Sequence, residues 1–180
     1  GRVDILSGGT PCQAFSVAGL RNSLADARGN LSLEFVRLAH ELAGLSTSSE
    51  HDGPVRNRAG NGLRNVVWEN VPGVLSTKDN AFGCFLGALV GADDAVVPSP
   101  QPGERQSDAH WRWKAKSGKH SLKWPDAGMV DGPKGRAAWR ILDAQYFGLA
   151  QRRKRVIVVA DFGNGADPAA VLFERASQIG

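Results

Sequence analysis

The chain has 180 residues, which suits one domain of ordinary size, and its 42% hydrophobic and 22% charged residues are typical of a globular protein with a buried core. It has no apolar run long enough to span a bilayer and no signal-peptide pattern, so a membrane protein is excluded and a soluble, cytoplasmic protein is predicted. The two cysteines are too few for a disulfide scaffold or a cysteine-based zinc site. The formal net charge of +4 is compatible with an anionic partner, although many proteins with this excess bind no polyanion.

Apolar segments with strand and helix periodicities alternate along the chain. The run from Val156 to Ala160 is entirely apolar, as in a strand that is covered on both faces of a sheet. In contrast, Leu31, Phe35 and Leu38 recur at the spacing of an amphipathic helix. Strands are predicted at residues 2–7, 65–68, 137–143 and 155–161, and helices at residues 31–45, 79–90 and 167–176. This alternation predicts an α/β sheet with helices on both faces.

Two stretches between these elements lack a clear period. Residues 46–62 are polar and rich in glycine, which predicts an exposed loop. Residues 93 to about 135 hold several prolines and glycines and are predicted to form a long insertion. Loops of that length within a compact domain are usually functional or disordered.

A basic and aromatic segment lies within this insertion. From Trp111 to Trp124 the chain reads WRWKAKSGKHSLKW, with five basic residues and no acidic one. Basic residues interleaved with aromatic ones suit phosphate contacts and base stacking. The tryptophans, Trp113 included, are equally suited to anchoring a long loop, so both interpretations stay open.

Chemically active residues stand beside three predicted strand ends. Cys12 follows the first strand, Glu69 follows the second, and Arg153 and Arg155 stand at the start of the last strand. In an open α/β sheet, functional residues gather beyond the carboxyl ends of strands, so these side chains are expected at one rim. A thiol, a carboxylate and two guanidinium groups there would form a site suited to covalent catalysis. Cys84, by contrast, lies in a helical apolar pattern and is predicted to be core.

Four strings of the sequence carry a resemblance to one family. They are GGTPCQAFSVAG at residues 8–19, ARGNLSLEFVRLA at 27–39, VVWENVPGV at 66–74 and AQYFGLAQRRKRVIVVA at 144–160. In order and spacing they resemble motifs of DNA (cytosine-5)-methyltransferases of bacterial or phage type, as in restriction-modification systems. The resemblance covers residues 1 to about 162 and leaves the insertion outside it. It implies a Rossmann-like, S-adenosyl-L-methionine-dependent methyltransferase sheet with helices on both faces, present here in incomplete form.

The activity that this resemblance implies is transfer of a methyl group from S-adenosyl-L-methionine to carbon 5 of cytosine in double-stranded DNA. Cys12 would add to carbon 6 of a cytosine flipped out of the duplex. Glu69 would hydrogen-bond the Watson–Crick edge of that base and favour protonation at its ring nitrogen 3. Arg155 would contact the carbonyl oxygen of the base, and Arg153 would support the site.

The resemblance also assigns contacts to the cofactor and to the DNA. Pro11 and Leu31 would lie against S-adenosyl-L-methionine, with Leu31 near its adenine. Gln13 and Ser16 would lie against the vacated DNA or its phosphates. No metal is expected, because the histidines have no metal-ligand spacing.

Parts of the family pattern are missing from this chain. Residue 1 begins after the point where the family's Phe-x-Gly-x-Gly cofactor loop would stand, and the target-recognition region is also missing. Residues 1–180 are therefore expected to be a partial catalytic domain with weak or no activity alone, and Gly1 is not expected to be the natural start. Two other functions stay open: a tRNA cytosine-5 methyltransferase, and an inactive remnant that binds nucleic acid through its basic segments.

Overall fold

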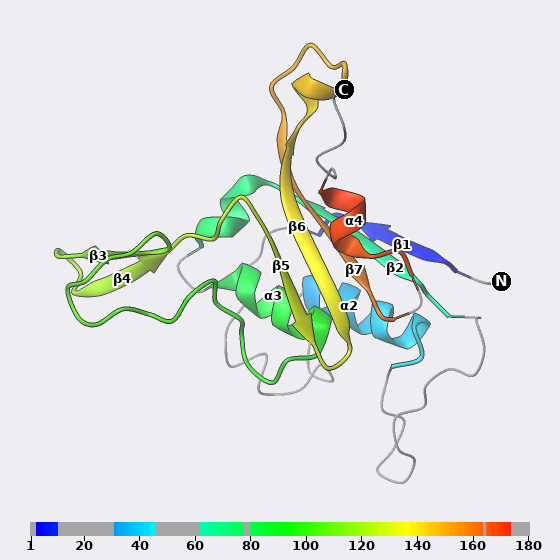
Figure 1. The fold of residues 1–180 in the computed structure, drawn as a ribbon, viewed down its shortest axis with the longest axis horizontal. Coiled ribbons are helices and arrows are strands. Elements are labelled where there is room, and N and C mark those ends of the chain that lie inside the picture. The colour runs from blue at the N-terminus through cyan, green and yellow to red at the C-terminus, as the bar shows by residue number, and fades with distance from the viewer. Residues whose placement is uncertain (1–2, 11–30, 46–61, 78–79, 164, 174–180) are drawn as a thin grey trace, which may run out of the picture.

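A five-stranded mixed sheet forms the centre of the computed structural model, which describes residues 3–10, 31–45, 62–77, 80–163 and 165–173 (Figure 1). The strand order is β1-β2-β7-β6-β5. The strands are β1 (Ile5–Gly8), β2 (Asn65–Asn70), β5 (Ala127–Gly132), β6 (Gly135–Asp143) and β7 (Lys154–Asp161). Only β1 and β2 run parallel, and the other neighbouring pairs are antiparallel. The predicted α/β class is confirmed, with a sheet that is mixed.

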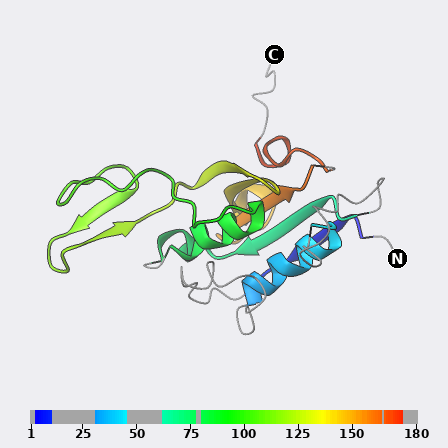
Figure 2. The same ribbon diagram turned by 90° about the horizontal axis from the view of Figure 1, so that it is seen from below.

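Helices cover both faces of the sheet, as predicted. The helices α2 (Leu31–Leu42) and α3 (Ala81–Val90) lie against one face, and the short helix α4 (Pro168–Leu172) lies against the other (Figure 2). α3 ends where Gly91 adopts a left-handed φ of 75°, which suits glycine. α4 is shorter than the helix predicted at 167–176, since it already ends before Phe173, and residues 174–176 lie outside the described residues.

Alternation along β7 divides the core between these two faces. Val156 and Val158 belong to the large cluster around α3, whereas Val159 packs with Leu172 of α4 on the opposite face. The large cluster also contains the predicted core residue Cys84, which is fully buried in α3. The fully apolar pattern of β7 therefore has the predicted cause, which is burial on both sides. Across the described residues, no helix combines the length and apolar character needed to cross a bilayer.

The stretch from residue 93 to about 135, predicted to be a long loop, lacks helix and strand only as far as residue 110. Within this stretch β3 (Trp111–Lys114) and β4 (Lys119–Leu122) form a separate two-stranded hairpin, and β5 joins the main sheet beside β6. Strands of four residues are too short for alternation to stand out in the sequence. β5 contains two glycines, which weaken its intrinsic strand preference, and it acquires strand structure through pairing with β6.

Two tryptophans attach the hairpin to the body of the protein. The Trp124 ring is buried edge-on against both Phe82 and Trp139, and its indole N–H donates to Asn80 Oδ1 at 2.8 Å. The Trp111 indole N–H donates to the carbonyl oxygen of Ser99 at 2.9 Å. The anchoring interpretation therefore holds for these two side chains.

Candidate functional site

The sheet topology brings several of the predicted site residues to one rim. β1 and β2 are parallel, so their carboxyl ends meet, and the register of β2 with β7 sets Asn70 opposite Val156. The start of β7, with Arg155, therefore lies beside the end of β2. Glu69 was expected just after this strand and lies within it, one residue before β2 ends at Asn70.

An ion pair joins the two strands at this rim. Arg155 Nε lies 2.6 Å from Glu69 Oε1, and the side chains remain 29% and 42% exposed respectively. One terminal nitrogen of Arg155 also donates to the Lys154 carbonyl oxygen at 2.8 Å. Because a pair this exposed contributes about 1 kcal/mol or less to stability, its main consequence is a carboxylate held in one orientation at an open edge.

Thr10 is the centre of a hydrogen-bond network beside this ion pair. Its hydroxyl oxygen accepts from the Trp68 indole N–H at 2.9 Å and lies 2.5 Å from the Ser32 hydroxyl oxygen of α2. The Asn70 amide donates to the Thr10 carbonyl oxygen at 2.9 Å and accepts from the Val71 N–H at 2.8 Å. The network links β1, β2 and α2, so the chain leaves the rim from a fixed position at Thr10.

The two glycines before Thr10 pack closely against neighbouring side chains. A Cβ atom on Gly8 would lie 2.8 Å from the Phe35 ring, and one on Gly9 would lie 3.1 Å from Glu69 Oε2. Neither glycine has a positive φ. The two glycines therefore allow a close approach of the backbone to α2 and to Glu69.

Arg153 lies in the turn before β7, where its side chain is exposed. Its backbone N–H donates to Asp143 Oδ1 at 3.1 Å. The buried Asp143 carboxylate also accepts from the backbone N–H and the side-chain amide of Gln145. Asp143 therefore holds together the turn that carries Arg153, and the structure does not bring the Arg153 side chain into the Glu69–Arg155 pair.

A hollow of about 420 Å³ adjoins this turn, where β6 ends in the 3-10 helix η3 (Ala144–Phe147). The exposed Tyr146 and Phe147 supply aromatic surface there, and Lys154 supplies positive charge. Such a combination can contact bases and phosphates. The hollow is lined by, among others, Asp126, Arg140, Asp143, Tyr146, Phe147 and Lys154.

Four predicted site residues lie outside the described residues, namely Pro11, Cys12, Gln13 and Ser16. Leu31 is described, and it stands at the first position of α2 with half of its surface exposed. It is followed by Ser32 of the Thr10 network, which places this apolar surface near the rim. Within the described part of the chain, no group of three or more histidine, cysteine, aspartate or glutamate side chains could hold a metal.

Several residues that organise the rim were not predicted from the sequence. Thr10 and Ser32 carried no signal, because their contact joins segments 22 positions apart. Asn70 stood next to Glu69 in the quoted string VVWENVPGV, which was the available signal for it. The aromatic pair Tyr146 and Phe147 before Gly148 was a similar signal that went unused.

His40 is buried between α2 and α3, the two helices that lie against the same face of the sheet. His40 Nε2 lies 3.0 Å from the Leu89 carbonyl oxygen, and the ring meets Phe162 edge-on. Burial, assisted by the charge of nearby Lys134, lowers the pKa of His40 to about 4, against the opposing effect of the hydrogen bond to Leu89. His40 is therefore a neutral packing residue of the helix that supports the rim, and it contacts no rim side chain in the interactions described above.

Comparison with known proteins gives two different matches. The family described as C-5 cytosine-specific DNA methylase matches residues 1–45. The DNA N-6-adenine-methyltransferase of Escherichia phage P1 is 52% identical over 171 residues, which cover 95% of this chain and 21% of that protein. The type II methyltransferase M.Eco47II of Escherichia coli is 55% identical over 40 residues, 22% of this chain and 10% of that protein. No solved structure matches.

The phage P1 relative overturns the assignment to the cytosine-5 family and the expected cytosine-5 activity. It matches nearly the whole chain and is named for nitrogen 6 of adenine, whereas the cytosine-5 family matches only the first quarter. The same match contradicts cytosine as the target base, and therefore also the flipped cytosine and the tRNA cytosine alternative. The expected cofactor agrees with these relatives, because DNA methyltransferases use S-adenosyl-L-methionine.

Proposed function

We propose that this chain is a segment of a DNA methyltransferase that transfers a methyl group from S-adenosyl-L-methionine to nitrogen 6 of adenine. The observation that carries the proposal is the 52% identity to the phage P1 enzyme over 95% of the chain. The chain spans about a fifth of that relative, so residues 1–180 are proposed to be part of a catalytic domain. The relatives' names support DNA as the substrate.

The chemistry at nitrogen 6 differs from that at carbon 5 of cytosine. S-adenosyl-L-methionine supplies, when bound, an electrophilic methyl group on a sulfonium sulfur. The exocyclic amine of adenine is itself a nucleophile, so the new nitrogen–carbon bond forms as the carbon–sulfur bond breaks, and one proton leaves the nitrogen. No covalent enzyme–base intermediate is needed, and a cysteine nucleophile is not required.

In this proposal Glu69 acts on the target amine. Its carboxylate accepts a hydrogen bond from the amine N–H, which raises electron density on the nitrogen, and it receives the proton after transfer. Arg155 holds the carboxylate in place through the 2.6 Å contact. The adenine must leave the duplex to reach this rim, because its amine is otherwise paired and stacked.

The other predicted site residues keep supporting roles in the proposal. Leu31, half exposed at the start of α2, offers an apolar surface that suits the adenine of the cofactor, and Pro11 lies on the chain that follows Thr10. Gln13 and Ser16 belong to the same stretch and are proposed to contact DNA. Arg153, exposed beside Arg155, is proposed to contact a phosphate near the flipped base.

The test replaces the matching segment of the phage P1 relative by this chain and measures methylated nucleosides by mass spectrometry after DNA digestion. We expect N6-methyladenine, formed more slowly when Glu69→Gln is introduced. The matched control is Glu34→Gln, which removes a carboxylate on the outer surface of α2 that pairs with Arg37. Formation of 5-methylcytosine, or an unchanged rate with Glu69→Gln, would overturn the proposal.

A further inference from the structure

The β3–β4 hairpin separates its side chains into two chemically different faces. Directly opposite residues share a face, and the register pairs Lys114 with Lys119 and Arg112 with Ser121. Alternate residues on a strand also share a face, so Arg112, Lys114 and Lys119 stand together. All three side chains are exposed and together form the cationic face of the hairpin.

The other face of the hairpin is already covered. It carries Trp111 and Trp113 on β3, opposite Leu122 and His120 on β4. The His120 ring meets both tryptophans edge-on, with centroids 6.2 Å and 5.0 Å away. His120 Nε2 also lies 2.9 Å from the carbonyl oxygen of Gln106, in the segment that precedes the hairpin. The cationic face is therefore the side of the hairpin that is left open.

The charges of the cationic face work against the fold of the hairpin. Lys114 and Lys119 stand directly opposite each other, and like charges in that position are destabilising. No acidic residue occurs between Trp111 and Trp124 to offset them. The nearby Asp108 carboxylate accepts from the backbone N–H groups of Trp111 and His110, which lower its pKa. A charge arrangement that costs stability points to a ligand of opposite charge.

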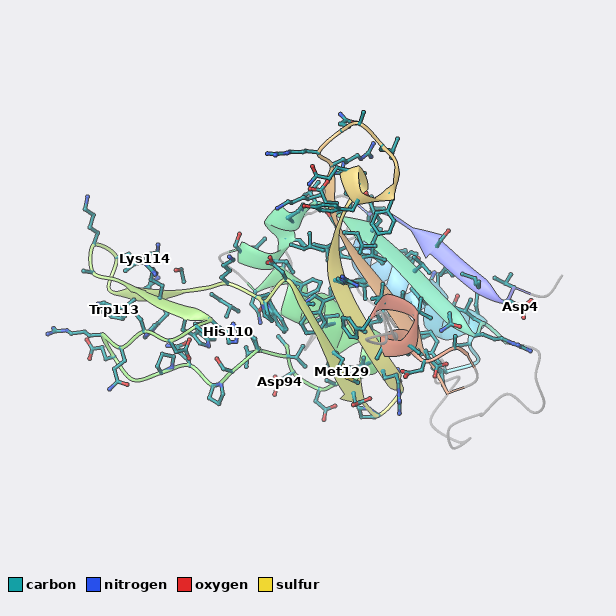
Figure 3. The ribbon with its side chains drawn as sticks, turned by 45° about the horizontal axis from the view of Figure 1, so that its top comes forward. Asp4, Asp94, His110, Trp113, Lys114 and Met129 are labelled. Carbon is teal, nitrogen blue, oxygen red and sulfur yellow. The ribbon has the colours of Figure 1, made fainter. Side chains whose placement is uncertain are left out.

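The position of the hairpin relates the cationic face to the rim. The backbone N–H of Trp124 donates to the Leu75 carbonyl oxygen at 2.8 Å, in the 3-10 helix η2 (Pro72–Ser76) that follows β2. The base of the hairpin is thus tied to the segment that begins just after Asn70. In Figure 1 the hairpin projects from the side toward which β1 and β2 run. Figure 3 places Trp113 and Lys114 on the far part of the hairpin, away from Asp4 at the opposite end of the molecule.

We propose that the cationic face binds the phosphate backbone of double-stranded DNA without reading its sequence. Three cations on a narrow ribbon match a duplex, which carries one negative charge per about 1.7 Å of its axis. The cationic face carries no aromatic side chain for base stacking, since Trp111 and Trp113 belong to the opposite face of the hairpin. The inference rests on the proposed function for DNA as the ligand, and it adds a binding surface outside the rim.

A competing explanation assigns these lysines to protection of exposed strand edges. Charged side chains, lysine above all, prevent edge strands from pairing with other molecules. That role predicts aggregation when the charges are removed and no change in the salt dependence of DNA binding. The phosphate-binding role predicts a change in that salt dependence, so the two roles separate in one titration.

The experiment measures binding of the 180-residue chain to a fluorescent duplex of mixed sequence by anisotropy, over a series of salt concentrations. The variant is Arg112→Gln/Lys114→Gln/Lys119→Gln. Since each phosphate contact contributes about 0.9 to the slope of log K against log salt, we expect the slope to fall by about 2 to 3. The control Arg136→Gln removes one charge at the far end of β6, where Arg136 faces Asp131 and Asp167, and should leave the slope unchanged.

A second variant separates the loss of charge from a loss of folding. Lys114→Arg/Lys119→Arg keeps both charges and should keep the slope, while circular dichroism and tryptophan fluorescence confirm that the glutamine variant retains the fold. An unchanged slope in the folded glutamine variant would overturn the inference, and so would tighter binding to duplex RNA with the same loss of slope. If Glu69→Gln leaves methylation unchanged while the glutamine variant loses its slope, the proposed function fails and this binding surface stands.

Discussion

The rim and the cationic face hold their polar groups in opposite ways. At the rim, Glu69 is paired with Arg155, and Thr10 joins Trp68 and Asn70 through hydrogen bonds. On the hairpin, Lys114 opposes Lys119 in a segment without acidic residues. Groups held by one another are suited to positioning a single atom, whereas like charges held side by side are suited to a polyanion of variable sequence.

The largest effect is expected at the rim carboxylate. Glu69→Gln keeps the shape of the side chain and removes the proton acceptor, so methyl transfer by the chimaeric enzyme should fall about 100- to 1,000-fold. Lys114→Gln, on the hairpin, should leave the rate at saturating DNA unchanged. Single-turnover rates with labelled S-adenosyl-L-methionine provide the measurement, and equal losses in both variants would contradict the separation of chemistry from binding.

Acid should lower the free energy of unfolding through protonation of His40, which is buried between α2 and α3. The pKa of His40 is lowered from its ordinary value of 6.5 to about 4, so the unfolded chain binds a proton at a higher pH than the folded chain. His40 therefore leaves the free energy of unfolding unchanged above pH 6.5. As the pH drops from 6.5 to 4, its protonation in the unfolded chain lowers that free energy by up to about 3 kcal/mol. Urea unfolding at several pH values tests this.

His40→Gln is the matched variant for the acid experiment. Glutamine can still donate to the Leu89 carbonyl oxygen but does not titrate, so the pH-dependent loss should shrink relative to the unsubstituted chain. The same pH dependence in both proteins would show that another group causes the acid sensitivity.

A smaller loss of stability is expected from the hydrogen bonds of the rim. Asn70→Ala removes the buried amide that bonds Thr10 and Val71, which should cost about 1–3 kcal/mol of unfolding free energy. The hairpin equivalent is Ser121→Ala, which removes a hydrogen bond to the Arg112 carbonyl oxygen at an exposed site. That change should alter stability by about 0.5 kcal/mol or less. Urea midpoints of the two variants would contradict the contrast if they shifted equally.

The same two regions differ in how much could be predicted from the sequence. Four strands of the main sheet were predicted from apolar segments such as Val156 to Ala160, whereas β5, with its two glycines, was not. Glu69 and Arg155 were correctly expected at one rim, because the ends of neighbouring strands are set by topology. The hairpin was missed, because its four-residue strands gain their structure from pairing and from the anchoring of Trp111 and Trp124.

The hydrogen bonds of the rim could not be predicted from the sequence, because they join distant segments of the chain. The bond between Thr10 and Trp68 joins residues 58 positions apart, and neither residue type announces such a partner. The close packing of Gly8 against Phe35 and of Gly9 against Glu69 likewise joins segments that are distant in the sequence. The target base was predicted from strings such as VVWENVPGV, and the match over 95% of the chain to a relative named for nitrogen 6 of adenine contradicts that prediction.

The smallest effect is expected at Cys12, and it follows from the acceptor atom. Methyl transfer to an exocyclic amine proceeds without an enzyme–base bond, so Cys12→Ser should change the rate of N6-methyladenine formation by about threefold or less, well under the effect of removing a proton-transfer group. A cysteine nucleophile would instead make the activity depend on the thiolate. Loss of activity in Cys12→Ser together with a covalent adduct to DNA in the unsubstituted enzyme would refute transfer to the amine. Retained activity would mean that Glu69 and Arg155 act at the rim without a thiol.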